Sequence, residues 1–387
     1  MLEGEDEILE TVQEEVSEKR PYYFQLDVLK AIAIAFVVMD HSLTWEIKGM
    51  LGSVFWERLS IPFFLIVMGF NTGISFRYRN AKSLRELYSF DYFKRKVKRY
   101  VLPFIILWFA SLYVGWALGY IDTSGYLWLG FLPFWGPGNW FIPLLFGSIL
   151  VFPFIYWLFE RSPIFTIVVC FLSELIFQYI LWFLYPAATT TYDWFVITAI
   201  RVNVLFFLPA VGIGLWFSKG YNIEAKRNWF IYPYLAISVF FMFDYATGVL
   251  SSHSSLFGQM MSFIQEFIRG DYTLLFYGYA AFLVVIVLIV VPNTATGVFQ
   301  KFVQRIGKST YHILLFQIFW MSLVYWTVSP DAVMHQYLPN FALILGWPSP
   351  VFYIPFYLLN LSVSFTGGML WYELERRLLY RKQQSPI

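Results

Sequence analysis

Residues 24–43 read FQLDVLKAIAIAFVVMDHSL, and after a short loop residues 59–70 read LSIPFFLIVMGF. The first run is long and apolar enough for a helix that crosses a bilayer, yet it carries Asp27, Lys30 and His41 on one side. Lys30 and His41 lie about 20° apart around such a helix and about 16 Å apart along it. Because charges inside a membrane are costly, they normally face protein or a water-filled cavity. This column of ionisable side chains therefore predicts a polar path through a helix bundle.

Two interpretations of the column stay open. Asp27 lies about 60° from Lys30 on the same side of the helix, and Asp40 lies about 80° away on the other. A structural Asp27–Lys30 pair and a buried, hydrogen-bonded His41 would also account for these side chains. In the functional interpretation His41 is the reacting group, because a neutral imidazole can take a proton from a hydroxyl or an amine at physiological pH.

The composition indicates an all-α, polytopic membrane protein. Hydrophobic residues make up 59% of the 387 residues and charged residues only 13%, whereas a soluble protein carries about 25% charged residues. The single cysteine, Cys170, excludes an internal disulfide and argues against a thiol-ligated metal site, so we expect no metal. The sequence holds neither a Walker motif nor GxGxxG, and we interpret Gly212 and Gly214 as sites of close helix packing.

About ten apolar runs have the length of a transmembrane helix. They lie near residues 26–48, 54–76, 100–120, 139–159, 163–184, 195–217, 230–250, 272–291, 307–328 and 350–372. With a cytoplasmic N-terminus, 22 of the 27 Lys and Arg residues fall in cytoplasmic segments, and the external segments hold only Lys48, Arg58 and Arg269. This asymmetry fits the positive-inside rule, so we predict a multi-pass protein of the cell membrane with both termini in the cytoplasm.

The charge distribution also predicts how the chain is divided. Residues 1–20 form an acidic cytoplasmic segment, residues 21–375 the transmembrane domain, and residues 376–387 a basic cytoplasmic tail. Length alone gives no reason to divide such a membrane protein into soluble domains.

Three further charged residues fall inside predicted spans. Arg201 and Asp244 lie about two turns inside the external ends of the sixth and seventh spans, at the depth of His41. Glu174 lies near mid-membrane. We therefore hypothesise a polar pocket around His41 in the outer half of the membrane, with Arg201 paired to Asp244 or Glu174. The alternative is a structural Arg201–Asp244 pair that ties two helices together.

The cytoplasmic end of the first span carries a second candidate site. Lys30 lies about one turn inside that end. There it can join the basic run KRKVKR at residues 94–99, which heads the third span. Together these groups would form an electropositive mouth for a phosphorylated cytosolic ligand. Because topology alone also requires a basic loop here, Lys30 is the residue that favours a ligand.

The first two spans resemble the membrane-bound acyltransferase family 3. Lys30 and His41 match that family's pattern of a basic residue, ten intervening residues and a histidine, although arginine is commoner at the first position. Residues 61–70, IPFFLIVMGF, resemble its second-helix motif, Pro-x-Phe-Phe followed by a Ser-Gly-Phe-like triplet. The tripeptide Met-Asp-His at residues 39–41 is also similar to a sequence of the related heparan-glucosaminide N-acetyltransferase group.

Three later motifs extend the resemblance over most of the chain. Lys96 and Arg99 resemble the Arg-x-x-Arg pair at the head of the third helix, and Asn139-Trp140-Phe141 resembles the His-Trp-Phe-like start of the fourth. Residues 306–317 resemble the motif Gly-Lys-x-Ser-Tyr-x-x-Tyr-Leu-x-His, with Gln317 in place of its histidine. The matching residues of this last motif are Gly307, Lys308, Tyr311 and Leu315.

The resemblance implies a ten-helix acyltransferase that passes the acyl group of cytosolic acyl-CoA, usually acetyl-CoA, to a carbohydrate or glycolipid acceptor on the outer side, by O- or N-transfer. His41 would be catalytic with Lys30 as its basic companion, and Asp40 and Arg201 complete the catalytic candidates. The acyl-CoA-binding candidates are Lys30, Lys96, Arg99, Asn139, Trp140, Lys308 and Tyr311. The polar residues expected to be structural or to face the acceptor are Asp27, Glu174, Asp244 and Gln317.

The expected partners are the lipid bilayer, acyl-CoA as co-substrate and the acceptor, with no nucleic acid and no permanently bound cofactor; the oligomeric state stays open. Ten spans with buried charges would also suit a second class of protein, a transporter or flippase for a lipid-linked glycan or small solute. Transporters often have repeated halves with broken helix pairs, and the sequence has no such symmetry. A non-catalytic scaffold explains neither Lys30 nor His41, so the acyltransferase is our leading hypothesis.

Overall fold

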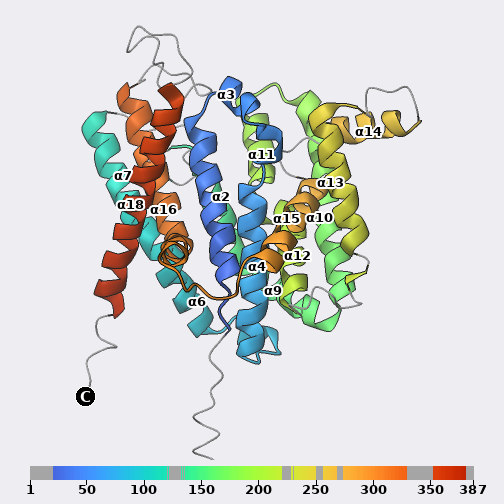
Figure 1. Ribbon diagram of the computed structural model, residues 1–387, viewed down its shortest axis with the longest axis horizontal. Helices are drawn as coiled ribbons and strands as arrows, with labels where there is room; N and C mark the ends of the chain where they lie inside the picture. The colour runs from blue at the N-terminus through green and yellow to red at the C-terminus, as the bar shows by residue number, and fades with distance from the viewer. Residues whose placement is uncertain are drawn as a thin grey trace, which may run out of the picture.

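The computed structural model describes residues 21–119, 121, 132, 134, 136–219, 228–229, 231–249, 256–267, 273–328 and 352–380. In this part of the chain the regular structure is entirely helical (Figure 1). The predicted acidic segment at 1–20 lies outside the described residues, as does the predicted basic tail beyond Tyr380.

The helices up to the middle of the chain are α2 (Phe24–Ser42), α3 (Trp45–Met50), the 3-10 helix η1 (Ser53–Phe55), α4 (Ser60–Tyr78), α5 (Leu84–Leu87), α6 (Phe90–Lys96), the π-helical turn η2 (Val97–Val101), α7 (Leu102–Leu118), α9 (Phe141–Arg161) and α10 (Pro163–Ala187). They are followed by α11 (Thr191–Arg201), the 3-10 helix η3 (Val204–Phe207), α12 (Leu208–Ser218), α13 (Ile231–Thr247), α14 (Leu256–Phe267), α15 (Leu274–Val290), α16 (Val298–Val328) and α18 (Tyr353–Tyr380). Each of the ten predicted spans overlaps at least one of these helices.

Several described helices have the length and composition of membrane spans. Four stretches qualify singly: Ser53–Tyr78, Leu84–Leu118, Phe141–Arg161 and Pro163–Ala187. The pair Tyr192–Arg201 and Val204–Ser218 makes a fifth if it is one bent span. The chain is therefore an all-α membrane protein, while the count of ten crossings and the side on which each terminus lies stay predictions.

The helix in the first predicted span, 26–48, ends earlier than predicted. Helix α2 ends at Ser42, because Leu43 leaves the helical region with φ −116° and ψ 142°, and the short helix α3 begins only at Trp45. His41 therefore lies in the last turn of its helix instead of well inside a span. Hydrophobicity continues across the turn, so the apolar pattern alone did not reveal this end.

The sixth predicted span, 195–217, is not one helix. It breaks after Arg201, and the two halves meet at an angle of 42°. Asn203 lies between the two halves and caps the start of the second, since its Oδ1 accepts a hydrogen bond of 2.9 Å from the backbone N–H of Leu205. Pro209 then occupies the first turn of α12, where a missing N–H costs nothing. Arg201 thus lies at the helix break, as the last residue of α11.

Figure 1 shows α2 and α4 in the middle of the bundle, with α7, α16 and α18 on one side and α10, α13 and α14 on the other. Helix α3 lies at one end of the bundle and α6 at the opposite end. The first turn of α2 and the last turn of α18 lie at the α6 end. We refer below to the α3 end and the α6 end of the bundle.

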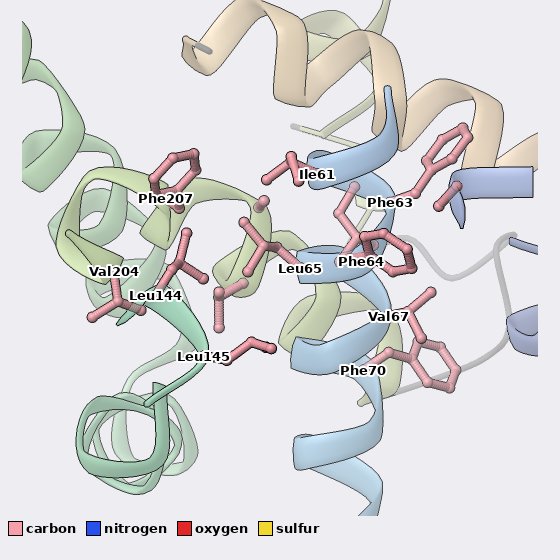
Figure 2. Close-up of a cluster of buried hydrophobic side chains, with 14 of the residues drawn as sticks. Ile61, Phe63, Phe64, Leu65, Val67, Phe70, Leu144, Leu145, Val204 and Phe207 are labelled. Atoms are coloured by element: carbon pink, nitrogen blue, oxygen red, sulfur yellow. The ribbon is translucent and has the colours of Figure 1, made fainter. Parts of the chain in front are cut away.

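Close helix contacts hold the middle of the bundle together. Figure 2 shows Leu65 of α4 pointing toward Leu144 of α9, with Phe207 of η3 nearby. Helices α4 and α12 approach so closely that a Cβ on Gly214 would lie 2.1 Å from the carbonyl oxygen of Ile66. The predicted role of Gly214 in helix packing is confirmed, since any larger residue would force the two helices apart.

Candidate active site

His41 lies against the buried amide of Gln317, which α16 supplies. Nδ1 of the imidazole and Nε2 of the amide are 3.1 Å apart, and Gln317 is fully buried. In this orientation the amide nitrogen donates to Nδ1, whereas a half-turn of the amide would let the Nδ1–H group donate to Oε1. The second arrangement leaves the lone pair on Nε2, which is the tautomer that a general base requires. The structure thus brings two candidate residues from distant parts of the sequence into contact.

A charged cluster flanks the Nε2 side of this imidazole. Oδ2 of Asp40 lies 3.7 Å from Nε2 of His41, and Oδ1 of Asp40 lies 2.5 Å from Nζ of Lys48. Nζ of Lys48 also lies 3.6 Å from Oε1 of Glu57 and 4.5 Å from the ring centre of Trp45. Although the sequence places Lys48 in an external segment, its side chain is only 8% exposed. Asp40 is therefore held between an ammonium and the imidazole.

Gly138 closes the site from a third direction. Its backbone has φ +91°, in the left-handed region that favours glycine. A Cβ at this position would lie 3.2 Å from Cε1 of His41 and 3.6 Å from Oε1 of Gln317. The backbone before α9 can therefore reach the imidazole only because residue 138 has no side chain.

Asn139 and Trp140 follow Gly138 directly and therefore lie at the His41 end of α2. The ring of Trp140 stacks on that of Phe207, with centroids 6.2 Å apart and planes 22° apart. Asn139 and Trp140 were predicted to bind acyl-CoA together with the basic residues at the α6 end. They lie instead directly after Gly138, which packs against His41.

A second polar cluster surrounds Lys30 at the α6 end. Nζ of Lys30 lies 2.5 Å from Oδ1 of Asp27, whose side chain is only 4% exposed. The hydroxyl of Tyr22 donates to Oδ2 of Asp27 and accepts a hydrogen bond of 2.8 Å from Nε2 of Gln304. The ammonium of Lys308 lies 5.2 Å from the ring centre of Tyr22. The predicted Asp27–Lys30 pair is thus present, and Lys308 lies next to it.

The basic residues at the start of the third span join this cluster. Lys30 lies within electrostatic range of Arg99 and Tyr100. The ring of Tyr100 is flanked by Lys96 at 5.3 Å and Arg99 at 5.4 Å, and its backbone oxygen accepts a hydrogen bond of 2.7 Å from the hydroxyl of Tyr311. The π-helical turn η2 contains Arg99 and Tyr100, and such turns are frequent at functional sites. Lys30 of α2 thus lies near the basic residues around η2, and their predicted role as a mouth for a phosphorylated ligand stays a prediction.

The face of α2 between the two clusters is apolar. Ile34 and Val37 lie between Lys30 and His41, within about 40° of the direction of Lys30. Both side chains are buried, with 0% and 6% exposed, and belong to the main apolar core. The prediction of a continuous polar path is therefore wrong in its middle section. Helical spacing locates the polar residues on one face, but apolar residues share that face and are buried in the core.

A comparison with protein families now identifies the group to which the chain belongs. The model for the acyltransferase domain matches residues 23–372, which is most of the chain. The protein belongs to acyltransferase family 3. No curated protein and no solved structure matches the chain. The matched region of the acyltransferase includes both Lys30 and His41.

Three charged candidates of the acyltransferase lie elsewhere. Glu174 and Asp244 are buried in α10 and α13, and Arg201 ends α11. Glu174 lies beside Gln178 of its own helix and within electrostatic range of Tyr234. Glu174 thus belongs to the interface of α10 and α13, and the pairing of Arg201 with either acid stays a prediction.

The acyltransferase also contains a buried pair near Arg99 that was not predicted from the sequence. Nε2 of His312 lies 2.9 Å from Oε2 of Glu375, which joins α16 to α18. The imidazole is packed edge-on against Trp371, with ring centroids 5.4 Å apart. His312 directly follows Tyr311 and forms no part of the resemblance. A histidine and a glutamate on two long helices near one end of the bundle were the signal that could have found it.

We expect Lys48 to act as a positioning residue for Asp40, and its removal to have a measurable consequence. In Lys48→Met the carboxylate of Asp40 loses its ion pair, so it no longer holds its second oxygen toward His41. We expect kcat for acyl transfer to fall about tenfold, which corresponds to about 1.4 kcal/mol, with KM for the acyl donor unchanged. Lys48→Arg should restore most of the rate. A fall in donor KM instead of kcat, or no change at all, would contradict this role.

Proposed function

We propose that this acyltransferase moves an acyl group, acetyl in the first instance, from cytosolic acyl-CoA to a hydroxyl or amine of a carbohydrate or glycolipid on the opposite side of the membrane. The observation that carries the proposal is the pair of clusters on one face of α2. A group of cations surrounds Lys30 at one end, and the imidazole of His41 lies about 16 Å further along the helix.

The cluster around Lys30 suits the phosphates of acyl-CoA. Lys30, Lys96, Arg99 and Lys308 bring four cations to the α6 end, and cationic side chains bind phosphate through charge-assisted hydrogen bonds. From there the thioester would extend along α2 toward His41. Passage along this face requires the side chains of Ile34 and Val37, which are buried between the clusters, to move aside.

His41 would act as general base in the transfer step. Nε2 removes the proton from the acceptor hydroxyl or amine, and the acceptor oxygen or nitrogen attacks the thioester carbonyl. The C–S bond then breaks, and the CoA thiolate takes up the proton from the imidazolium. Asp40, held by Lys48, would steady that imidazolium. Arg201 is the candidate for polarising the thioester carbonyl or holding an acidic acceptor, and a transient acyl-imidazole is the alternative route.

The acceptor is proposed to be a carbohydrate. The similarity of residues 39–41 to the heparan-glucosaminide N-acetyltransferase group supports this class of acceptor, and O-transfer and N-transfer remain alternatives within it. The bilayer orientation in the proposal is the predicted one, with the α6 end in the cytoplasm.

The test uses the purified full chain in sealed vesicles with acetyl-CoA, carbon-14-labelled in the acetyl group, at the α6 face. We expect label to appear in a carbohydrate acceptor supplied at the other face, with release of one CoA thiol for each acetyl transferred. Vesicles without acceptor and vesicles without protein serve as controls. Release of CoA without any labelled acceptor, whatever carbohydrate is supplied, would contradict the proposal.

One observation favours a transporter or flippase as the second candidate. The break between α11 and α12 resembles the interrupted helices that transporters use at their binding sites. The same vesicles distinguish the two classes. A transporter would move an unmodified labelled carbohydrate or lipid-linked glycan across the membrane in the absence of acetyl-CoA, whereas the acyltransferase would release CoA thiol.

A further inference from the structure

Glu174 lies in the middle of a helix that is long and apolar enough to cross a membrane. Helix α10 runs from Pro163 to Ala187, so Glu174 lies about 16 Å from one end and about 20 Å from the other. Its side chain points into the protein, because only 1% of it is exposed, and Cys170 and Gln178, one turn away on either side, are buried as well. An ionised carboxylate at this depth is costly, so its surroundings decide which form it takes.

The groups that surround the carboxyl are polar but uncharged. Tyr234 of α13 lies within electrostatic range of Glu174, and the backbone N–H of Leu274, at the start of α15, lies nearby. The hydroxyl of Tyr234 donates to the backbone oxygen of Leu274. The ring of Tyr234 also packs against that of Phe171 of α10, with centroids 5.3 Å apart. Helices α10, α13 and α15 therefore meet at this carboxyl.

The carboxyl of Glu174 is unpartnered. Neither of its oxygens has a hydrogen-bond partner among the described residues. The titratable groups that face it are Tyr234 and, one turn earlier on α10, Cys170, which packs against Gly212 of α12. Both are neutral at neutral pH, so neither can balance a negative charge. An ionised Glu174 would be a buried charge without a partner, whereas a neutral carboxylic acid avoids that cost.

A proton suits this site better than a metal cation. A metal cation needs several oxygen ligands at once and the room to hold it between them. Helices α13 and α15 leave little room here, because a Cβ on Gly278 would clash with the hydroxyl of Ser238. A proton needs no cavity, and it neutralises the carboxyl completely.

We propose that Glu174 is a proton-binding site within the membrane, which keeps its proton while α10, α13 and α15 pack together and releases it when their interface opens to water. The ionised carboxylate needs water as a partner, so loss of the proton favours the opened interface and uptake of a proton closes it. This inference goes beyond the proposed function and does not depend on acyl transfer.

The first arm of the test measures whether Glu174 carries a proton, with the full chain in nanodiscs and dicyclohexylcarbodiimide, an apolar reagent that adds to protonated carboxyls. The acid proton passes to a nitrogen of the reagent and the carboxyl oxygen bonds to its central carbon. The adduct then rearranges to a stable N-acylurea that retains the whole reagent and is located by mass spectrometry. We expect Glu174 to be labelled, at a rate that falls about tenfold for each pH unit above its titration midpoint. Asp27, which Lys30 holds at 2.5 Å, is the internal control and should stay unlabelled.

Two results of this arm would overturn the proposal. If Glu174 is not labelled at any pH, it is ionised, as it would be if Arg201 or another cation were its partner. If sodium chloride slows the labelling and choline chloride at the same concentration does not, the site takes a metal cation instead of a proton. This arm uses the wild-type chain, so it decides the question even if a variant of Glu174 does not fold.

The second arm measures amide hydrogen exchange in α10, α13 and α15. In the wild type we expect a change from mildly acid to mildly alkaline pH to raise their exchange more than that of α4, because ionisation opens the interface. Glu174→Gln keeps the shape of the neutral acid and cannot ionise, so its exchange should follow α4 at every pH. Glu160→Gln, which removes a carboxyl beside Arg77 at the end of α9, is the matched control and should behave as the wild type. An equal rise in Glu174→Gln and the wild type would contradict the proton site.

These results are distinguishable from those that test the proposed function. Labelling of Glu174 in a chain that transfers acetyl to no acceptor would support the proton site and contradict the acyl transfer. Acetyl transfer by a chain whose Glu174 stays unlabelled would support the transfer and contradict the proton site.

Discussion

Replacing His41 with alanine is expected to lower kcat for acyl transfer by about 10²- to 10⁴-fold, the range that a positioned general base contributes. The imidazole is held on one side by Gln317 at 3.1 Å and faces Asp40 at 3.7 Å on the other, so its ring has a fixed orientation. Alanine removes the proton acceptor while favouring the helix in which it lies. The measurement is a single-turnover transfer of labelled acetyl from acetyl-CoA, with purified protein in nanodiscs.

A matched pair of variants separates the reaction from the fold. His41→Gln and His312→Gln each replace a histidine in the transmembrane domain by an amide of similar reach. His312 pairs with Glu375 at 2.9 Å and has no part in the proposed transfer. We expect His312→Gln to retain most of the rate and His41→Gln to lose it, with similar thermal unfolding of both. Full activity in His41→Ala would remove this imidazole from the mechanism.

Helical periodicity was sufficient to predict which residues of α2 share a face. Lys30 and His41 lie at the two ends of that face, and the predicted Asp27–Lys30 pair is present at 2.5 Å. Periodicity works here because the residues belong to one uninterrupted helix, so their relative directions follow from 100° per residue. The same argument cannot say what fills the space between them, since Ile34 and Val37 share the face and their neighbours come from another helix.

The apolar pattern could not predict where helices end or break. Lys48 lies in what the sequence indicates as the end of the first span or an external loop, yet the turn at Leu43 folds α3 back and buries its ammonium against Asp40 and Glu57. Asn203 gives a local signal for the break in the sixth span, because its side chain can cap the following turn. Both features depend on side-chain caps and turns, which hydrophobicity averaged over about 20 residues does not detect.

The motifs suggested which residues of distant helices could bind a ligand, but not where in the fold each of these residues lies. The motif around Lys308 and Tyr311 resembles one that suggested acyl-CoA binding, and the structure places both residues near Lys30. Asn139 and Trp140 carried a similar resemblance, yet Gly138 brings them to His41 instead. The motifs therefore did not indicate at which of the two clusters a residue lies, because the turn geometry decides that.

Lys30→Met is the second variant for which we expect a large effect. It tests whether Lys30 binds the acyl donor or only forms a structural ion pair with Asp27. A charge-assisted hydrogen bond contributes about 1.5–3 kcal/mol, so KM for acetyl-CoA should rise by about 10- to 150-fold. The single variant also leaves Asp27 buried without its cation, which costs about 3–5 kcal/mol of stability. Loss of activity in Lys30→Met alone therefore has two possible causes.

The double variant Asp27→Asn/Lys30→Met separates these causes. Asparagine removes the buried charge and can still accept the hydrogen bond that the hydroxyl of Tyr22 donates to residue 27. Thermal unfolding should therefore return close to that of the wild type, while KM for acetyl-CoA stays raised. Lys30→Arg, which keeps the charge beside Asp27, should bind the donor nearly as well as the wild type. If KM returns to the wild-type value in the double variant, Lys30 serves only as the partner of Asp27, and the phosphates of acyl-CoA must be bound by Lys96, Arg99 and Lys308 without it.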